Sequence, residues 1–149
     1  MQPNLRTAVV ESIRRRVDPD EYRAIRQLWV AHSLAEDAHD IPGLMATLTE
    51  DCIYTVVNTG TSWHRKSGAT QFYQQLLTAF PDIHFDLQNI VIGPQGVFEE
   101  AFATATYQSQ WLDLPSPTAQ PIEFAVTILF PWHPKQRLFT GERIYFFMK

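Results

Sequence analysis

The sequence predicts an α+β fold in which helices pack on one face of a curved, mostly antiparallel sheet. Helical periodicity dominates the chain up to residue 80, whereas the rest is a series of long segments rich in β-branched and aromatic residues, separated by turns. Such segregation of helices from strands is typical of α+β folds. With 149 residues, 45% of them hydrophobic, the chain is large and apolar enough to bury the core of one domain.

Residues 1–18 are expected to form a helical extension that precedes the main domain at 19–149. Apolar residues recur there at every fourth position, which predicts one short helix with an apolar stripe made of Leu5, Val9, Ile13 and Val17. A basic run at 14–16 follows. We interpret it as a solvated helix end; contact with an anion or a membrane surface is the alternative.

A longer helix is expected to begin at Asp18, whose side chain suits the N-cap, with Pro19 in the first turn. One face of this helix is apolar and also carries His32. At helical spacing with His32 lie Tyr22, Ile25, Leu28, Trp29 and Ala35. The polar residues 36–40 are expected to end the helix in solvent.

The remaining elements are a short helix from Pro42, a clear helix at 68–80 that Pro81 ends, and a series of strands. The strands are predicted at 52–59, 63–64, 84–92, 97–111, 122–130 and 138–147. They are joined by a turn at 93–96, a proline-rich loop at 114–121 and a turn at 131–134. Alternation in the first strand places four side chains on one face: Cys52, Tyr54, Val56 and Asn58.

Composition excludes several classes of protein. A net charge of −4 does not suit non-specific binding to nucleic acid, which needs a basic surface. The only cysteine, Cys52, can form no intrachain disulfide and is interpreted as a structural thiol. No apolar run is long enough to span a bilayer, and the N-terminus lacks a signal-peptide core, so a cytoplasmic protein without membrane contacts is expected. The sequence has no glycine-rich phosphate loop and no nucleophile turn.

Three features carry a family resemblance: Asp51 directly before a predicted strand, a helix that ends in Phe80-Pro81-Asp82, and a closing Gly-Glu-Arg-Ile-Tyr-Phe at 141–146. In this order, over residues 20–147, the sequence resembles the SnoaL-like polyketide cyclases of the NTF2-like superfamily, which includes ketosteroid isomerase. The resemblance implies a cone-shaped fold whose sheet wraps the helices around a deep, largely apolar cavity. It also implies a homodimer, commonly formed through the outer face of the sheet.

The sequence departs from the family at several positions. Where ketosteroid isomerase has a Tyr, an Asp base and a protonated Asp, this chain has His32, Val56 and, by hand alignment, Val126. Two of the three are apolar, which argues against steroid isomerisation. Tyr107 stands where related cyclases often have a His. The fold hosts cyclases, isomerases, hydrolases, dehydratases and binding proteins, so fold alone does not identify the activity.

His32 and Glu142 are the predicted catalytic residues. His32 carries an imidazole, the side chain most often used for proton transfer, and lies on the face of the first long helix that would border the cavity. Glu142 alternates with apolar residues on the last strand, and a buried carboxyl suits general acid–base catalysis. We expect the two side chains on opposite walls with the substrate between them. The alternatives are a buried His satisfied by a neighbour, and a Glu142 paired with an arginine on the outer face.

Four further residues are predicted to orient the substrate: Tyr54, Asn58, Trp63 and Tyr107. For each, ordinary packing in the core or at the rim is the alternative. Four residues raise the question of a metal site: Asp37, His39, Asp40 and His64. However, no His-x-x-x-His pair occurs, and the segment at 36–40 is interpreted as a solvated helix end. Neither a metal ion nor an organic cofactor is therefore expected.

The leading functional hypothesis is a SnoaL-like enzyme that performs cofactor-free acid–base chemistry on a hydrophobic carbonyl compound: a cyclisation, an isomerisation or a dehydration. A non-catalytic NTF2-like protein that binds an apolar small ligand is the alternative. A third possibility is a dimeric interaction protein with a filled interior. The expected partners are a hydrophobic small molecule and a second copy of the chain.

Overall fold

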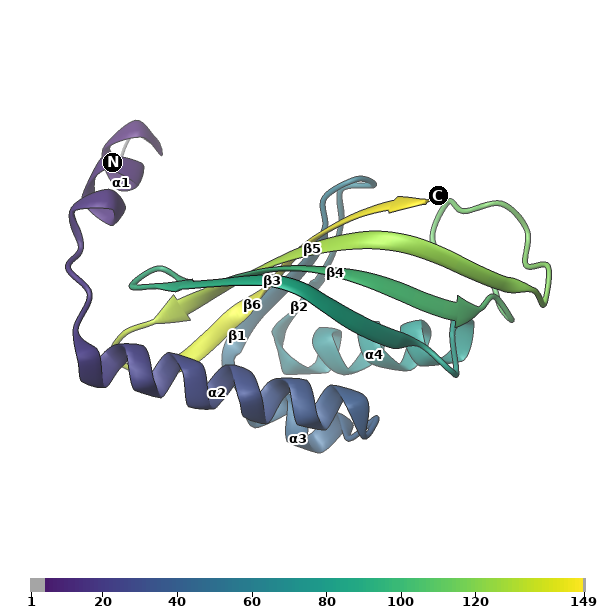
Figure 1. Cartoon of the computed structure of the whole chain (residues 1–149), viewed down its shortest axis with the longest axis horizontal. Coiled ribbons are helices and arrows are strands. Elements are labelled where there is room, and N and C mark those ends of the chain that lie inside the picture. The colour runs from purple at the N-terminus through teal and green to yellow at the C-terminus, as the bar shows by residue number, and fades with distance from the viewer. Residues whose placement is uncertain (1–4, 149) are drawn as a thin grey trace.

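Helices α2, α3 and α4 cover one face of a six-stranded sheet in the computed structural model, which describes residues 5–148 (Figure 1). The helices are α1 (Leu5–Arg14), α2 (Pro19–Asp37), α3 (Ile41–Met45) and α4 (Arg65–Ala79). The strands are β1 (Leu48–Val56), β2 (Thr61–His64), β3 (His84–Gly93), β4 (Gly96–Thr106), β5 (Pro121–His133) and β6 (Leu138–Met148). This arrangement confirms the predicted α+β class.

The strands lie in the order β2-β1-β6-β5-β4-β3. All neighbouring pairs are antiparallel except β1 and β6, which are parallel. The last strand, β6, therefore lies between β1 and β5 and joins the β1–β2 hairpin to the β3–β4–β5 meander in one sheet. Because β6 is central, its side chains reach the middle of the space under the helices.

Several predicted strand ends are wrong by a few residues. β1 begins at Leu48 rather than at residue 52, and it ends at Val56. β4 ends at Thr106 rather than at 111, because Asp82 accepts hydrogen bonds at 2.6 Å from both the backbone N–H and the hydroxyl of Thr106. β5 continues to His133, through residues predicted to form a turn.

The predicted start of α2 is confirmed. The side chain of Asp18 accepts hydrogen bonds from the backbone N–H groups of Asp20 and Glu21, at 2.9 and 3.0 Å. Such an N-cap stabilises a helix by about 1 kcal/mol. α2 buries Ile25, His32 and Ala35 against the sheet, which carries the polar His32 into the core.

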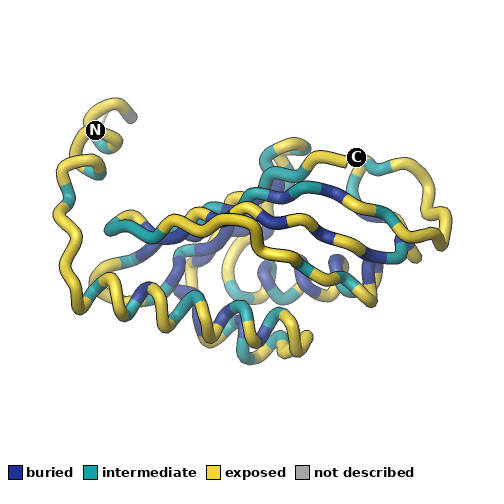
Figure 2. The backbone as a smooth tube through the Cα atoms, in the orientation of Figure 1, coloured by how far each residue is buried: buried dark blue, intermediate teal, exposed yellow. Residues whose placement is uncertain are grey.

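α1 lies apart from the main body, on the side of the sheet away from α2, and Figure 2 shows it largely exposed. Its apolar residues face solvent, with Val9 58% and Ile13 71% accessible. Residues 1–4 of the predicted extension, and the side chain of Leu5, lie outside the described residues. Arg15, expected in a solvated run, instead contacts Glu21 and the carbonyl oxygen of Pro94, and so fastens the linker to the domain.

A bulge in β6 directs Glu142 into the interior. Between the register pairs Leu129–Arg143 and Trp132–Phe139, β6 contains one residue more than β5. Gly141 lies in this irregular stretch with φ +130°, and a Cβ at this position would lie 1.9 Å from the carbonyl oxygen of Ile53. Bulges of this kind redirect side chains, here placing both Phe139 and Glu142 in the interior.

Among the described residues, no helix combines the length and the apolar character that crossing a bilayer requires.

Candidate functional site

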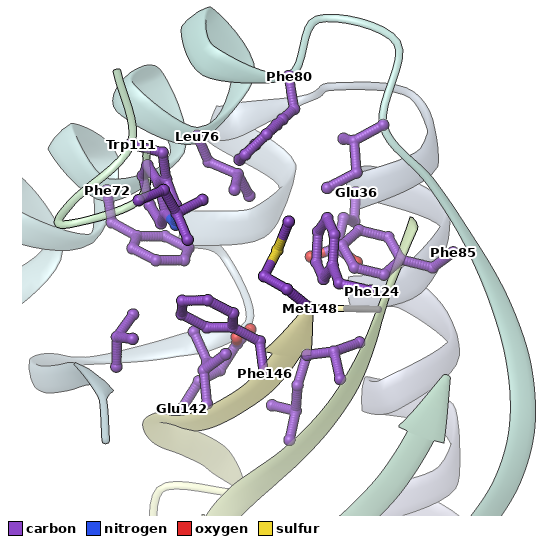
Figure 3. A pocket seen from close by; sticks show the side chains of 16 residues that line it. Glu36, Phe72, Leu76, Phe80, Phe85, Trp111, Phe124, Glu142, Phe146 and Met148 are labelled. Carbon is purple, nitrogen blue, oxygen red and sulfur yellow. The ribbon is translucent and has the colours of Figure 1, made fainter. Parts of the chain in front are cut away.

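A narrow apolar pocket opens between the sheet and helices α2 and α4 (Figure 3). Its walls are aromatic and aliphatic side chains, with Glu36 and Glu142 as the two ionisable residues among the sixteen that line it. The apolar lining consists of Val56, Phe72, Leu76, Phe80, Ile83, Phe85, Trp111, Leu114, Phe124, Val126, Ile128, Ile144, Phe146 and Met148. Such a lining with few polar groups is typical of small-molecule sites.

Three hydrogen-bonding groups converge on one oxygen of Glu142. Its Oε1 lies 2.9 Å from His32 Nε2 and accepts from the hydroxyls of Tyr54 and Tyr73, each at 3.0 Å. His32 and Glu142 are 1% and 2% exposed, and both tyrosines are fully buried. Among the hydrogen bonds of the described residues, none ends on Glu142 Oε2, although Glu142 lines the pocket. The carboxyl group is therefore held by one oxygen.

The protonation of one His32 ring nitrogen follows from its neighbours. Thr47 Oγ1 donates its single proton to the carbonyl of Leu44 at 2.7 Å, and it lies 2.7 Å from His32 Nδ1. Thr47 Oγ1 can therefore only accept in the second contact, so Nδ1 carries a proton. With Nδ1 protonated, Nε2 faces Glu142 Oε1 and, at 3.2 Å, the hydroxyl of Tyr73; its contact with Oε1 is a hydrogen bond in which one proton is shared between the imidazole and the carboxyl group.

Glu36 is the second carboxyl group in the pocket. It is half-buried, and burial, together with the negative charges of Glu142, Glu99 and Asp37, holds its pKa well above the ordinary range. This favours the protonated form, a carboxylic acid that can donate a hydrogen bond. Figure 3 shows the Glu36 and Glu142 carboxyl groups among the aromatic rings of the pocket.

The two tyrosines act as hydrogen-bond donors and not as bases. Burial, and then the charge of Glu142, raises the pKa of both Tyr54 and Tyr73 well above the usual value for tyrosine. Their hydroxyls also lie 3.0 Å from each other. Both therefore keep their protons and remain available to the Glu142 carboxylate.

Glu99 lines a neighbouring hollow on the other side of Glu36. That hollow shares Glu36 and Phe85 with the apolar pocket. Glu99 Oε2 accepts a hydrogen bond from Trp29 Nε1 at 2.9 Å. Burial, and then the charge of Glu142, raises the pKa of Glu99 to about 7. The charges of Glu142 and Glu99 thus both act on Glu36, and the charge of Glu142 also acts on Glu99.

The structure brings together three of the six predicted site residues: His32, Glu142 and Tyr54. The other three make ordinary structural contacts. Asn58 bridges to the backbone of Phe146 through both atoms of its amide. Trp63 stacks on Trp111, and Tyr107 packs on Phe80. None of these three lines the apolar pocket.

The expected separation of His32 and Glu142 is wrong. The two side chains touch each other, so no substrate fits between them, and His32 does not line the pocket. The outer-face alternative for Glu142 is also wrong, because the bulge at Gly141 turns it inward to His32. Cys52 is buried and, because burial raises its thiol pKa to about 11, it is a structural thiol as predicted.

Sequence analysis missed two residues of the site. Glu36 was assigned to a solvated helix end, although it lies four residues after His32 and so on the same face of α2. Tyr73 lies in the helix predicted at 68–80 and is not singled out in the sequence analysis. The spacing from His32 could have identified Glu36, whereas nothing local distinguishes Tyr73 from a packed aromatic residue.

The residues that could hold a metal ion in the structure differ from those that the sequence analysis considered for a metal site. Among the described residues, the candidate ligand atoms belong to His32, Glu36 and Glu142, and all lie within 4.8 Å of one another. In the segment at 36–40, Asp40 instead caps α3 by accepting a hydrogen bond from the backbone N–H of Gly43.

The sequence model of the SnoaL-like domain family matches residues 27–133. A candidate SnoaL-like polyketide cyclase from Jannaschia sp. CCS1 has the same fold, with a TM-score of 0.74 and 16% identity over 89% of this chain and 90% of that one. IdmH, a candidate polyketide cyclase from Streptomyces antibioticus, gives 0.65 and 18% over 82% and 91%. AclR, a candidate hydroxylase from Streptomyces galilaeus, gives 0.67 and 16% over 84% and 79%. No curated protein matches the sequence.

Proposed function

The chain belongs to the SnoaL-like domain family, and on that premise we propose that it is an enzyme performing acid–base chemistry on a hydrophobic carbonyl compound. The observation that carries the proposal is the convergence of three hydrogen-bonding groups on Oε1 of Glu142, a carboxyl group that also lines an apolar pocket. Buried carboxyl groups are costly unless they are held in this way. A pocket that served only to store an apolar ligand would not need one.

The substrate class follows from the lining. Among residues 5–148, which the structure describes, no lysine or arginine lines the pocket, and both ionisable lining residues are acidic. An anionic ligand would meet only like charge there, while a flat, uncharged molecule with one or two carbonyl or hydroxyl groups would bury its body against aromatic rings. Polyketide-like compounds are members of this class, in agreement with the description of IdmH as a candidate polyketide cyclase.

In the proposed mechanism Glu142 moves the proton. Its Oε2, which has no hydrogen bond among the described residues, abstracts a proton from the carbon next to the substrate carbonyl. The electron pair left on that carbon forms an enolate, and the Glu36 carboxylic acid donates a hydrogen bond to the enolate oxygen. In a cyclisation the enolate carbon attacks a second carbonyl, whose C=O π bond breaks, and the resulting alkoxide takes the proton from Glu142. In an isomerisation the enolate takes that proton back at another carbon.

His32 is a positioning residue in this mechanism. It contacts Glu142 Oε1 and does not line the pocket, so it acts through the carboxylate. Together with Tyr54 and Tyr73 it fixes the plane of the carboxylate and keeps Oε2 directed to the substrate. Fixing a catalytic group in advance avoids reorganisation during the reaction.

The proposal is tested by proton exchange, which needs no knowledge of the complete reaction. Flat hydrophobic ketones and polyketide-like compounds that raise the melting temperature are incubated with the protein in D₂O. Wild-type protein is expected to catalyse deuterium uptake next to the carbonyl, and Glu142→Gln to lose at least about 100-fold of that rate. Glu99→Gln, in the neighbouring hollow, serves as the matched control and should retain exchange.

A different outcome would favour the binding alternative. If hydrophobic carbonyl compounds stabilise the wild-type protein and Glu142→Gln equally, and neither protein catalyses exchange, the pocket binds without catalysis. Stabilisation by nucleotides or sugars in place of hydrophobic compounds would contradict the substrate class itself.

A further inference from the structure

The inner end of the pocket holds more negative charge than its surroundings neutralise. Glu36 and Glu142 face the same cavity, and Glu99 lies close enough to affect both. Among the described residues, no lysine or arginine forms an ion pair with any of these three carboxyl groups. Two neighbouring carboxylates in an apolar site cannot both ionise at low cost without a cation. A bound proton is one solution and a metal cation is another.

The orientation of His32 provides a second, independent observation. Metal-binding histidines usually donate the N–H of one ring nitrogen to a fixed acceptor and coordinate through the other. His32 has this arrangement, because Nδ1 donates to Thr47 Oγ1 and Thr47 is itself anchored to the carbonyl of Leu44. Nε2 is thereby directed toward Glu142 Oε1, with the Glu36 carboxyl group within 4.8 Å, and its lone pair becomes available to a cation that displaces the proton shared with Glu142.

We propose that His32 Nε2 and the carboxylates of Glu36 and Glu142 form a binding site for a divalent transition metal, with Zn²⁺ as the ion that suits it. One imidazole and two carboxylates are a ligand set that Zn²⁺ accepts, at bond lengths of about 2.0–2.2 Å. At a tetrahedral ion, such ligands lie about 3.3 Å apart.

The observed geometry is close to this requirement. Nε2 and Glu142 Oε1 are 2.9 Å apart, and the ligand atoms of all three residues lie within 4.8 Å of one another. Closing the set needs a side-chain rotation of Glu36, which is half-buried and borders the open pocket, so that its carboxyl group has room to turn. Three protein ligands leave a coordination position, which opens to the pocket because Glu36 and Glu142 line it.

Metal and proton compete for the same atoms. A bound Zn²⁺ would occupy the Glu142 carboxylate and so remove the base of the proposed reaction, making the ion an inhibitor. The metal site does not rest on that reaction, since binding is measured without substrate. Stimulation of proton exchange by Zn²⁺ would overturn the metal-free mechanism and leave the site standing.

The experiment uses the full chain stripped of metal by a chelator. Zn²⁺ is titrated by calorimetry, and Co²⁺ is added as a spectroscopic probe of coordination geometry. Wild-type protein should bind one Zn²⁺ per chain and give the intense visible absorption of four-coordinate Co²⁺. Glu36→Gln should weaken Zn²⁺ binding by more than about 100-fold. The loss of a metal ligand should exceed the effect, about 10–100-fold, of losing a residue that only hydrogen-bonds to a ligand.

Two further variants separate this site from unspecific binding. Thr47→Val removes the acceptor of Nδ1 without touching a ligand and should weaken Zn²⁺ binding about 10–100-fold. His39→Gln, at an exposed histidine outside the cluster, should bind as the wild type does. The proposal is overturned if wild-type protein binds no Zn²⁺, if Glu36→Gln binds it equally well, or if His39→Gln abolishes binding. A folded Glu36→Gln, checked by its melting curve, makes these outcomes decisive.

Discussion

Glu142 Oε1 lies 2.9 Å from His32 Nε2, so two residues separated by 110 positions in the sequence share one buried contact. α2 carries the imidazole and the central strand β6 carries the carboxyl group. Both are almost wholly inaccessible to water, so each depends on partners inside the protein for its hydrogen bonds, and each is one of those partners for the other. Perturbing either one should therefore affect the stability of the fold as well as the chemistry of the pocket.

Replacing His32 tests that coupling. His32→Asn should lower the free energy of unfolding by about 2–4 kcal/mol, because the shorter side chain cannot reach both Thr47 and Glu142 and leaves buried polar atoms unpaired. Denaturant unfolding measures this change. His32→Gln, which is longer and reaches one partner, should lose less. A His32→Asn variant as stable as the wild type would show that the contact contributes nothing to folding.

The two tyrosines should be coupled energetically. Tyr54→Phe and Tyr73→Phe each remove one donor to Glu142 Oε1, and each should cost about 1–3 kcal/mol of unfolding free energy. Since the hydroxyls also contact each other, a double-mutant cycle should give an interaction energy of about 0.5–3 kcal/mol. Additive losses would mean that the three groups do not act as one network.

Glu99 should make stability depend on pH. Its folded pKa of about 7 lies above the ordinary glutamate value, so the unfolded chain releases the proton at lower pH than the folded protein does. Wild-type stability is therefore reduced progressively as pH rises from about 4 to 8, by up to about 3 kcal/mol. Glu99→Gln, which can still accept from Trp29, should lose the contribution of Glu99 to this dependence and leave that of Glu36, whose pKa is also raised. Glu100→Gln, at an exposed position of the same strand, is the control and should keep it.

Gly141 should tolerate no side chain. Its φ of +130° is unfavourable for other residues, and an alanine Cβ would lie 1.9 Å from the carbonyl oxygen of Ile53. Gly141→Ala should therefore cost at least about 3 kcal/mol, from strain together with displacement of β1 from β6. Gly93→Ala is the matched control, because nothing lies within 4 Å of the place that its Cβ would take and its φ is not positive. Equal melting temperatures for the two variants would contradict the role given to the bulge.

The outer face of the sheet should form a homodimer. Phe98 and Val91 are 44% and 64% exposed and lie opposite each other on β4 and β3, with Phe102 on the same face of β4. Apolar patches of this kind mark protein interfaces. Sedimentation at micromolar concentration should show twice the mass of one chain, and Phe98→Glu should shift it to the monomer. Leu34→Glu, at an exposed position of α2 on the opposite side of the sheet, serves as a control for a non-specific effect of charge. A wild-type monomer would refute this prediction.

Local sequence determined the elements of this protein. The Asp18 cap, the helical spacing in α2 and α4 and the alternation in β4 depend on neighbours a few residues apart, and all of them can be recognised in the printed sequence. The same periodicity was enough to place His32 on a buried face. Alternation in the first strand likewise gave the inward direction of Tyr54, although β1 begins four residues earlier than predicted.

Tertiary structure decided how these elements combine into a site. That β6 inserts beside β1 and that the bulge at Gly141 turns Glu142 toward His32 depend on pairings between distant strands, which leave no local pattern. The same holds for Glu36, whose polar neighbours in sequence suggested solvent, while the sheet that covers it comes from the other half of the chain. Burial is a property of the whole packed molecule, and it is burial that converts these ordinary carboxyl groups into a candidate acid and base.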